Sequence, residues 1–225
     1  MRSFETWTYE EVENVFGLTM HRTGQLFKEW LEAEACDPDA ATIQTLDQLR
    51  DLLFEEALNW NEDELKLFFI GPVLGLIKFK TPYFKPFTQR ILTAKYDGHS
   101  SSGKVDFLLA KGKVTPQNTY FCLHEYKQEN RRENDPLGQL LIGMVAAQQK
   151  NEGNHPIFGT YVSGRNWFFV MLDGKNYYLS DAYVASSDDL YKIYAILKKC
   201  RLMAEGMAIQ EAEQVKKKVG KEMEV

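Results

Sequence analysis

The sequence predicts an α/β fold that is preceded by an N-terminal helical extension. Apolar residues recur at helical spacing through residues 1–58, and short apolar, aromatic runs bounded by turn residues begin near residue 103. Helical patterns come before, between and after these runs. A chain of 225 residues with 44% hydrophobic content can form one medium-sized domain with an extension. We expect an acidic helical extension at 1–58, a core at 59–205 and a charged C-terminal tail at 206–225.

The elements follow from the spacing of apolar residues and from turn signals. Helices are expected at 9–16, 23–34 and 42–58, and a further helix at 61–79 is expected to kink at Pro72. Residues 87–94 are expected to form a short strand or helix. The remaining predicted strands are 103–110, 120–127, 157–162, 167–172 and 177–179, and the remaining predicted helices are 136–150 and 189–205. The highly charged residues 211–225 are expected to be frayed.

Three charged residues lie in two of the predicted core strands. Asp106 is the only acid in the apolar run 103–110, and Glu125 and Lys127 end the apolar run that begins at Tyr120. Residues two apart in a strand leave the same face, so Glu125 and Lys127 point the same way. A turn at 111–118 would pair the two strands and bring Asp106 close to them. Two carboxylates and an amine form a site suited to a hard cation such as Mg²⁺.

Asp106 followed by Glu125-Tyr126-Lys127 resembles the signature of the PD-(D/E)XK nuclease superfamily. Residues 60–200 are also similar to a group of bacterial proteins of unassigned function that share this core. In this resemblance Glu62 matches a glutamate on the opening helix. The resemblance implies a restriction-endonuclease-like mixed β-sheet flanked by helices, in the order helix, strand hairpin, strand, helix, strand.

The resemblance implies a metal-dependent nuclease that hydrolyses phosphodiester bonds in nucleic acid, with DNA favoured over RNA. The cofactor would be Mg²⁺ or Mn²⁺. Its implied ligands are Asp106, Glu125, the backbone carbonyl of Tyr126 and, in support, Glu62. Lys127 would position the attacking water or stabilise the phosphorus, and Gln139, which matches a glutamine on the helix after the third strand, would orient Lys127 or that water. The alternative function is a catalytically silent core that serves as a nucleic-acid or protein binding module.

Each candidate residue also has a structural explanation. Asn61 and Glu64 form a capping box, and acids in a first helical turn suit the helix dipole, which accounts for Glu62 as well. Asp135-Pro136 is a standard helix start, so Gln139 can be a polar residue one turn later that faces solvent. The three charged strand residues can equally form a buried structural ion pair.

The net charge of −5 hides a strong asymmetry along the chain. Residues 1–64 hold sixteen acids against four bases, whereas residues 78–113 hold eight bases against two acids. Because affinity for phosphate depends on local charge, we expect nucleic acid to bind this basic stretch. The expected contacts are Lys95, Lys104, Lys111 and Lys113. Aromatic residues among these bases either stack on nucleobases or pack beneath a loop. The acidic helices either dock a protein partner or mimic nucleic acid and cover the basic face.

Several classes of protein are not expected from this sequence. The longest apolar segment, residues 67–77, is too short to span a membrane, and the N-terminus lacks a signal-peptide pattern. The three scattered cysteines have no zinc spacing and cannot all pair. We therefore expect a cytoplasmic protein with reduced thiols and no membrane contact. The oligomeric state is open, and a dimer is compatible with the function that the resemblance implies.

Overall fold

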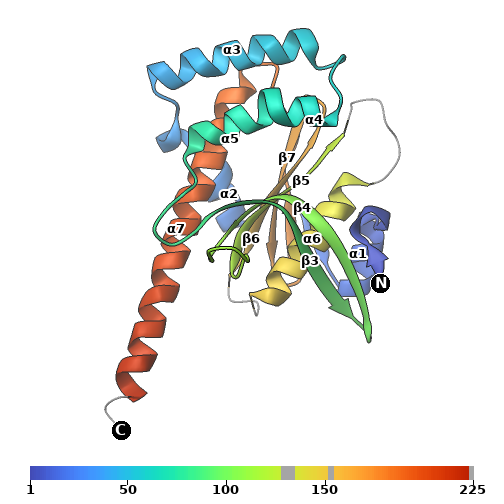
Figure 1. The fold of residues 1–225 in the computed structure, drawn as a ribbon, viewed down its shortest axis with the longest axis vertical. Coiled ribbons are helices and arrows are strands. Elements are labelled where there is room, and N and C mark those ends of the chain that lie inside the picture. Colours follow the sequence, from blue (N-terminus) through green and yellow to red (C-terminus); the bar gives the residue numbers. More distant parts are fainter. Residues whose placement is uncertain (128–134, 152–154, 223–225) are drawn as a thin grey trace.

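The structure, a computed structural model, describes residues 1–127, 135–151 and 155–222, without the side chains of residues 35, 123–127 and 215–222. In the described part of the chain, nine strands form one mixed sheet with helices on both of its faces (Figure 1). The predicted α/β class, with a mixed sheet flanked by helices, is therefore confirmed.

The strands are β1 (Arg2–Ser3), β2 (Thr19–His21), β3 (Lys85–Tyr96), β4 (His99–Ala110), β5 (Thr119–Lys127), β6 (Ile157–Ser163), β7 (Asn166–Asp173), β8 (Asn176–Leu179) and β9 (Tyr183–Val184). β3, β4 and β5 pair antiparallel in chain order, and β6, β7 and β8 do the same. β5 and β6 pair in parallel, which requires a crossover, and helix α6 supplies it.

The helices are α1 (Tyr9–Phe16), α2 (Gln25–Leu31), α3 (Ala40–Glu56), α4 (Glu62–Leu65), α5 (Gly71–Ile77), α6 (Pro136–Lys150) and α7 (Asp189–Glu222), with η1 (Phe4–Thr6), η2 (Glu34–Cys36) and η3 (Lys66–Ile70) between them. The sheet has a hydrophobic core on each face. Successive side chains of a strand point to opposite faces, so Leu108 belongs to one core and Leu109 to the other. Helices α1 and α6 cover one face, and α2, α3, α5 and α7 cover the other.

The segment from α4 to α5 continues as one helical rod, with the π-helix η3 in its middle. The amide of Gly71 donates to the carbonyl of Lys66, five residues earlier, as a π-helix requires. Pro72 follows immediately, and its ring would clash with a carbonyl in a regular α-helix. A widened turn therefore stands where the sequence predicted a kink. The predicted capping box between Asn61 and Glu64 is present.

The N-terminal segment and the first part of α7 join the main body of the protein, and the last turns of α7 project from it (Figure 1). The expected helices of residues 1–58 are present as α1 to α3, but this segment also adds β1 beside β4 and β2 beside β8. At the other end, α7 continues to Glu222, so the expected fraying of residues 211–222 is wrong. Ala208 is buried, and the Glu211 carboxylate accepts hydrogen bonds from Lys111 and Tyr120, which holds the helix against the sheet.

No helix in the described ranges combines the length and the apolar character that a membrane crossing needs. Cys36, Cys122 and Cys200 are buried free thiols. Burial raises the pKa of the Cys122 and Cys200 thiols, which keeps both in the neutral form.

Candidate functional site

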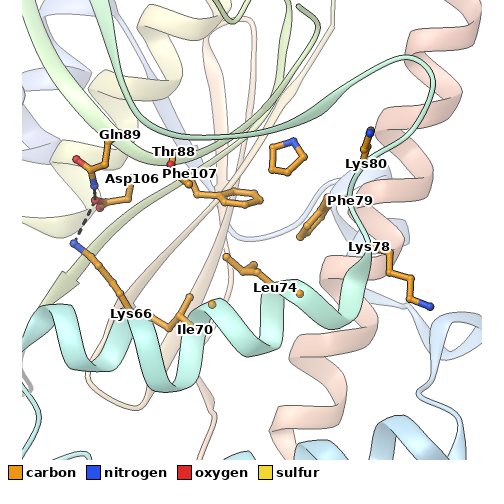
Figure 2. A pocket seen from close by; sticks show the side chains of 13 residues that line it. Lys66, Ile70, Leu74, Lys78, Phe79, Lys80, Thr88, Gln89, Asp106 and Phe107 are labelled. Carbon is orange, nitrogen blue, oxygen red and sulfur yellow. Dashed lines mark hydrogen bonds and ion pairs between the residues drawn. The ribbon is translucent and has the colours of Figure 1, made fainter. Parts of the chain in front are cut away.

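Asp106 lies in the second half of β4 and faces the helical rod formed by α4, η3 and α5. Its Oδ1 atom accepts a hydrogen bond from Nε2 of Gln89 at 2.6 Å and lies 3.3 Å from Nζ of Lys66 (Figure 2). Only 16% of the Asp106 side chain is exposed. The strand therefore presents a largely buried carboxylate to a lysine from a different element, 40 residues away in the chain.

The alternation of β4 breaks at Asp106. Val105 packs in the core under α6 and Phe107 in the core under α7, although residues two apart in a regular strand share a face. The β3–β4 ladder pairs the residues on either side of Gln89 and Asp106, but not these two. Gln89 has φ of 53°, in the left-handed region that costs a non-glycine residue about 1–2 kcal/mol. This distortion lets Asp106 share a face with Phe107.

Lys66 links Asp106 to Glu62. Its ammonium forms an ion pair with Glu62, one helical turn earlier, as well as with Asp106. Burial acts to lower the pKa of Lys66, but the hydrogen bond to Glu62 and the charge of Asp106 outweigh it, so the pKa is raised. Lys66 therefore stays protonated and neutralises part of the negative charge of the two carboxylates.

The β4–β5 pairing leads toward the predicted Glu125 and Lys127 positions. The ladder runs antiparallel from Ala110–Thr119 to Phe107–Leu123, so Asp106 lies one residue beyond its last pair. β5 continues past that pair to Lys127, and its ladder with β6 is irregular between His124 and Tyr126. Such bulges are frequent next to active sites. The side chains of residues 125–127 lie outside the described set, so their approach to Asp106 stays a prediction.

Gln139 occupies the first turns of α6, on the other face of the sheet from α5. It is fully buried, so the alternative in which it faces solvent is wrong. Its Nε2 atom donates to the carbonyl of Glu5 at 3.4 Å, and its Oε1 atom has no hydrogen-bond partner within the described residues. A buried acceptor without a donor is uncommon. No hydrogen bond joins Gln139 to Asp106 among the described residues.

A pocket of about 540 Å³ lies between the helical rod and strands β3 and β4 (Figure 2). Lys66, Gln89 and Asp106 form its polar end. The side chains of Phe79 and Phe107 contribute to its apolar part, together with aliphatic residues of α5. The candidate carboxylate thus lies beside a concave, mainly apolar space, as is usual for ligand sites.

The four lysines expected to bind nucleic acid have different surroundings. Lys95 and Lys104 are exposed on the β3–β4 hairpin, and Lys104 pairs with Ile91, four residues before Lys95. Both lysines therefore leave the same face of the hairpin. Lys111 is held by the Glu211 carboxylate at 2.5 Å. Lys113 lies in the turn before β5, where its carbonyl accepts a hydrogen bond from Lys85.

Neither the comparison with protein-family models nor the search of curated proteins finds a match for this chain.

The donor chemistry at Asp106 fits a hard divalent cation. Mg²⁺ is held through one or two carboxylates, and Asp106 and Glu62 are carboxylates joined by one ammonium. Within the described part of the chain there is no group of three or more His, Cys, Asp or Glu side chains placed to hold a metal ion. A further oxygen ligand, such as the predicted Glu125, is needed to complete a site.

Lys66, Gln89 and the pocket were missed at the level of sequence. Glu62 and Lys66 are four residues apart, which is a recognisable helical ion-pair spacing, so Lys66 had a detectable signal. Gln89 had none, because its position depends on a local distortion shared by two strands.

Proposed function

We propose that this protein is a metal-dependent nuclease that hydrolyses phosphodiester bonds in nucleic acid, with DNA as the favoured substrate. The observation that carries the proposal is the Asp106 carboxylate, which a strained strand segment turns toward Lys66 at the polar end of a pocket. The order from α4 to β6 is helix, two strands, strand, helix and strand, as expected for a restriction-endonuclease-like core. Both features support the proposal independently of one another.

In this proposal Asp106, Glu125 and the carbonyl of Tyr126 would hold Mg²⁺ or Mn²⁺. A bound ion of this kind lowers the pKa of water and neutralises charge on the phosphate. Lys127 would hold the attacking water or the phosphate through its ammonium. Glu62 would act through Lys66, because its carboxylate pairs with that ammonium.

Gln139 has a defined task in the same proposal. Its buried Oε1 atom is an acceptor that needs a donor. The ammonium of Lys127 is a suitable donor, so Gln139 would be a positioning residue that fixes the direction of the Lys127 side chain. This assignment depends on the predicted course of Lys127 at the end of β5.

The test is a cleavage screen over single- and double-stranded DNA and RNA, with Mg²⁺, with Mn²⁺ and with neither. Lys127→Ala should abolish cleavage in a protein that still unfolds in one cooperative transition. Its midpoint should fall, because the buried Gln139 acceptor loses its proposed donor. The matched control is Lys192→Ala, since Lys192 is an exposed lysine paired with Asp189 on α7. A Lys127→Ala variant that cuts as fast as wild type would contradict the proposed mechanism.

One observation favours the second candidate, a catalytically silent binding module. Lys66 neutralises part of the charge on Asp106 and Glu62 without a metal ion, so the carboxylates have a structural counterion. Calorimetric titration with Mn²⁺ separates the two candidates, with Glu125→Gln as the control. Binding that Glu125→Gln removes supports the nuclease, and absence of specific binding supports the module. The protein partner of the acidic helices and a dimer stay predictions.

A further inference from the structure

The pocket beside Asp106 has two chemically different halves. Lys66, Gln89 and Asp106 lie together at one end, whereas Phe79 and Phe107 form aromatic walls toward the other (Figure 2). The two aromatic rings are 5.4 Å apart at an angle of 57°, so they do not stack against each other in parallel. A flat apolar group between the helical rod and these rings would therefore find contacts on more than one side.

The walls of this pocket suit a nucleobase, and its volume leaves room for one. A volume of about 540 Å³ lies in the range of pockets that hold small ligands. Bases that are unstacked from their neighbours bind aromatic side chains through their faces, and hydrogen-bonding groups at the edge orient them. Thr88 and Gln89 line the pocket and carry such groups. A base paired and stacked in a duplex could not enter.

The charges at one end of the pocket suit a phosphate beside such a base. Lys78 and Lys80 are exposed residues of the pocket wall, and Figure 2 shows both at the end away from Asp106. Arg201 donates to the carbonyl of Lys78 at 3.2 Å, which fixes the backbone there. The end away from Asp106 therefore carries two lysine side chains that are unpaired among the described residues, whereas at the other end the Lys66 charge is paired with Glu62 and Asp106.

The backbone around the pocket departs from regular geometry at three places. Lys78 has φ of 54° and Gln89 has φ of 53°, both in the left-handed region, and the π-helix η3 contributes Lys66 and Ile70 to the wall. Strained backbone and π-helices are found preferentially at functional sites. The shape of the pocket therefore depends on specific irregularities of the backbone, in addition to the spacing of the elements around it.

We propose that this pocket receives one unstacked base of a single-stranded or locally opened nucleic acid, so that the adjacent phosphodiester lies at the Asp106 end. This inference rests on the proposed nuclease function and adds the substrate class to it. Lys78 and Lys80 bind the phosphate on the far side of the inserted base. The protein then selects unpaired over paired nucleic acid, because only an unpaired base reaches the pocket without disrupting a duplex.

Gly75 provides the test. It lines the pocket from α5, and a Cβ atom at this position would meet nothing within 4 Å, so a larger side chain can narrow the pocket from this wall without a clash at its Cβ atom. The matched control is Gly206→Leu in α7, where an added Cβ atom also meets nothing within 4 Å. Gly75→Glu is a second variant. Its side chain carries a negative charge that repels phosphate, whereas that of Gly75→Leu is apolar.

The probe is a single-stranded oligonucleotide with a central 2-aminopurine, as DNA and as RNA, measured in EDTA so that no metal-dependent cleavage occurs. Wild type and Gly206→Leu should bind it more tightly than the matching duplex, and the fluorescence of 2-aminopurine should change on insertion. Gly75→Leu should bind it about tenfold more weakly or worse, the loss of roughly one stacked base, and should lose the fluorescence change.

The outcomes separate the pocket from the nuclease. Equal affinity of Gly75→Leu and wild type for the single strand, or equal affinity of wild type for single strand and duplex, overturns the pocket inference even where cleavage is found. Loss of binding in both Gly75 variants supports the pocket, and if no metal-dependent cleavage is then found with wild type, only the nuclease proposal fails.

Discussion

The left-handed backbone at Gln89 should make a glycine at this position more stable than an alanine, which is the reverse of the usual order in a strand. In a regular strand, alanine is more stable than glycine by roughly 0.5–1 kcal/mol, because glycine loses more conformational freedom on folding. At φ of 53° an alanine carries a strain of about 1–2 kcal/mol that glycine does not. Both variants lose the hydrogen bond to Asp106, so this loss cancels in the comparison. The strain less this conformational cost leaves roughly 0.5–1 kcal/mol, by which we expect Gln89→Gly to exceed Gln89→Ala in free energy of unfolding.

Urea unfolding of the two variants measures this difference, and thermal unfolding should place their midpoints about 1–4 °C apart. Arg90 supplies the control, since it is the next residue of β3 and is paired in the ladder with Val105. Arg90→Ala and Arg90→Gly lose the same side-chain contacts, and here alanine should be the more stable. If Gln89→Ala proves at least as stable as Gln89→Gly, the strain at this position does not exist, and the account of how Asp106 is turned fails.

Three further predictions concern charge. Lys66→Met should bind Mn²⁺ about tenfold more tightly, because a positive charge beside the proposed ligands is removed; calorimetry showing no gain would contradict this. Replacing both Lys78 and Lys80 by alanine should lower the slope of log affinity against log salt for a single strand by about 1.4, and Lys28→Ala should leave that slope unchanged. Glu211→Gln should lower the free energy of unfolding at pH 7 by about 2 kcal/mol, measured in urea, since its carboxylate accepts charged hydrogen bonds.

The pH dependence of the Glu211 effect has a definite sign. Burial acts to raise the pKa of Glu211, but hydrogen bonds from Lys111 and Tyr120 outweigh it, so the pKa is lowered below its ordinary value of 4.5. The stabilisation by Glu211 is therefore fully present above that ordinary value and is lost as the pH falls through the folded-state pKa. Unfolding of wild type and Glu211→Gln should converge in acid; a constant difference from pH 7 to pH 3 would count against this explanation.

The local spacing of apolar residues was sufficient to predict the main strands and the central helix of the core. The apolar runs around Asp106 and Glu125 and the helical spacing of 136–150 predicted β4, β5 and α6, because burial of one face dictates the period of the apolar residues. The strands β1 and β2 have two and three residues, too few to show a period. Their places beside β4 and β8 depend on tertiary packing alone, so the sequence indicated only helices for this segment.

Long-range contacts decided what sequence could not predict at the candidate site. Lys111 was expected to bind nucleic acid because it lies in a basic stretch, but its partner Glu211 is 100 residues away. Similarly, Lys66 pairs with Asp106 across 40 residues, and no local pattern connects a helix to a strand at that separation. Charge counts along a chain identify where positive groups are concentrated, but not which of them are already neutralised within the fold.

The position of Lys66 bears on how a nuclease and a silent binding module of this fold would differ. Asp106 is largely buried and Glu62 is half exposed, and both carboxylates pair with the same ammonium. Lys66 thus supplies Asp106 with a counterion from within the chain in the absence of metal. In a nuclease the divalent ion would compete with this ammonium for the Asp106 carboxylate. In a silent module the Lys66 ammonium alone would neutralise the carboxylate charge. The backbone strain at Gln89 would then serve no catalytic function. That strain is therefore the feature of the site that a purely structural ion pair explains least well.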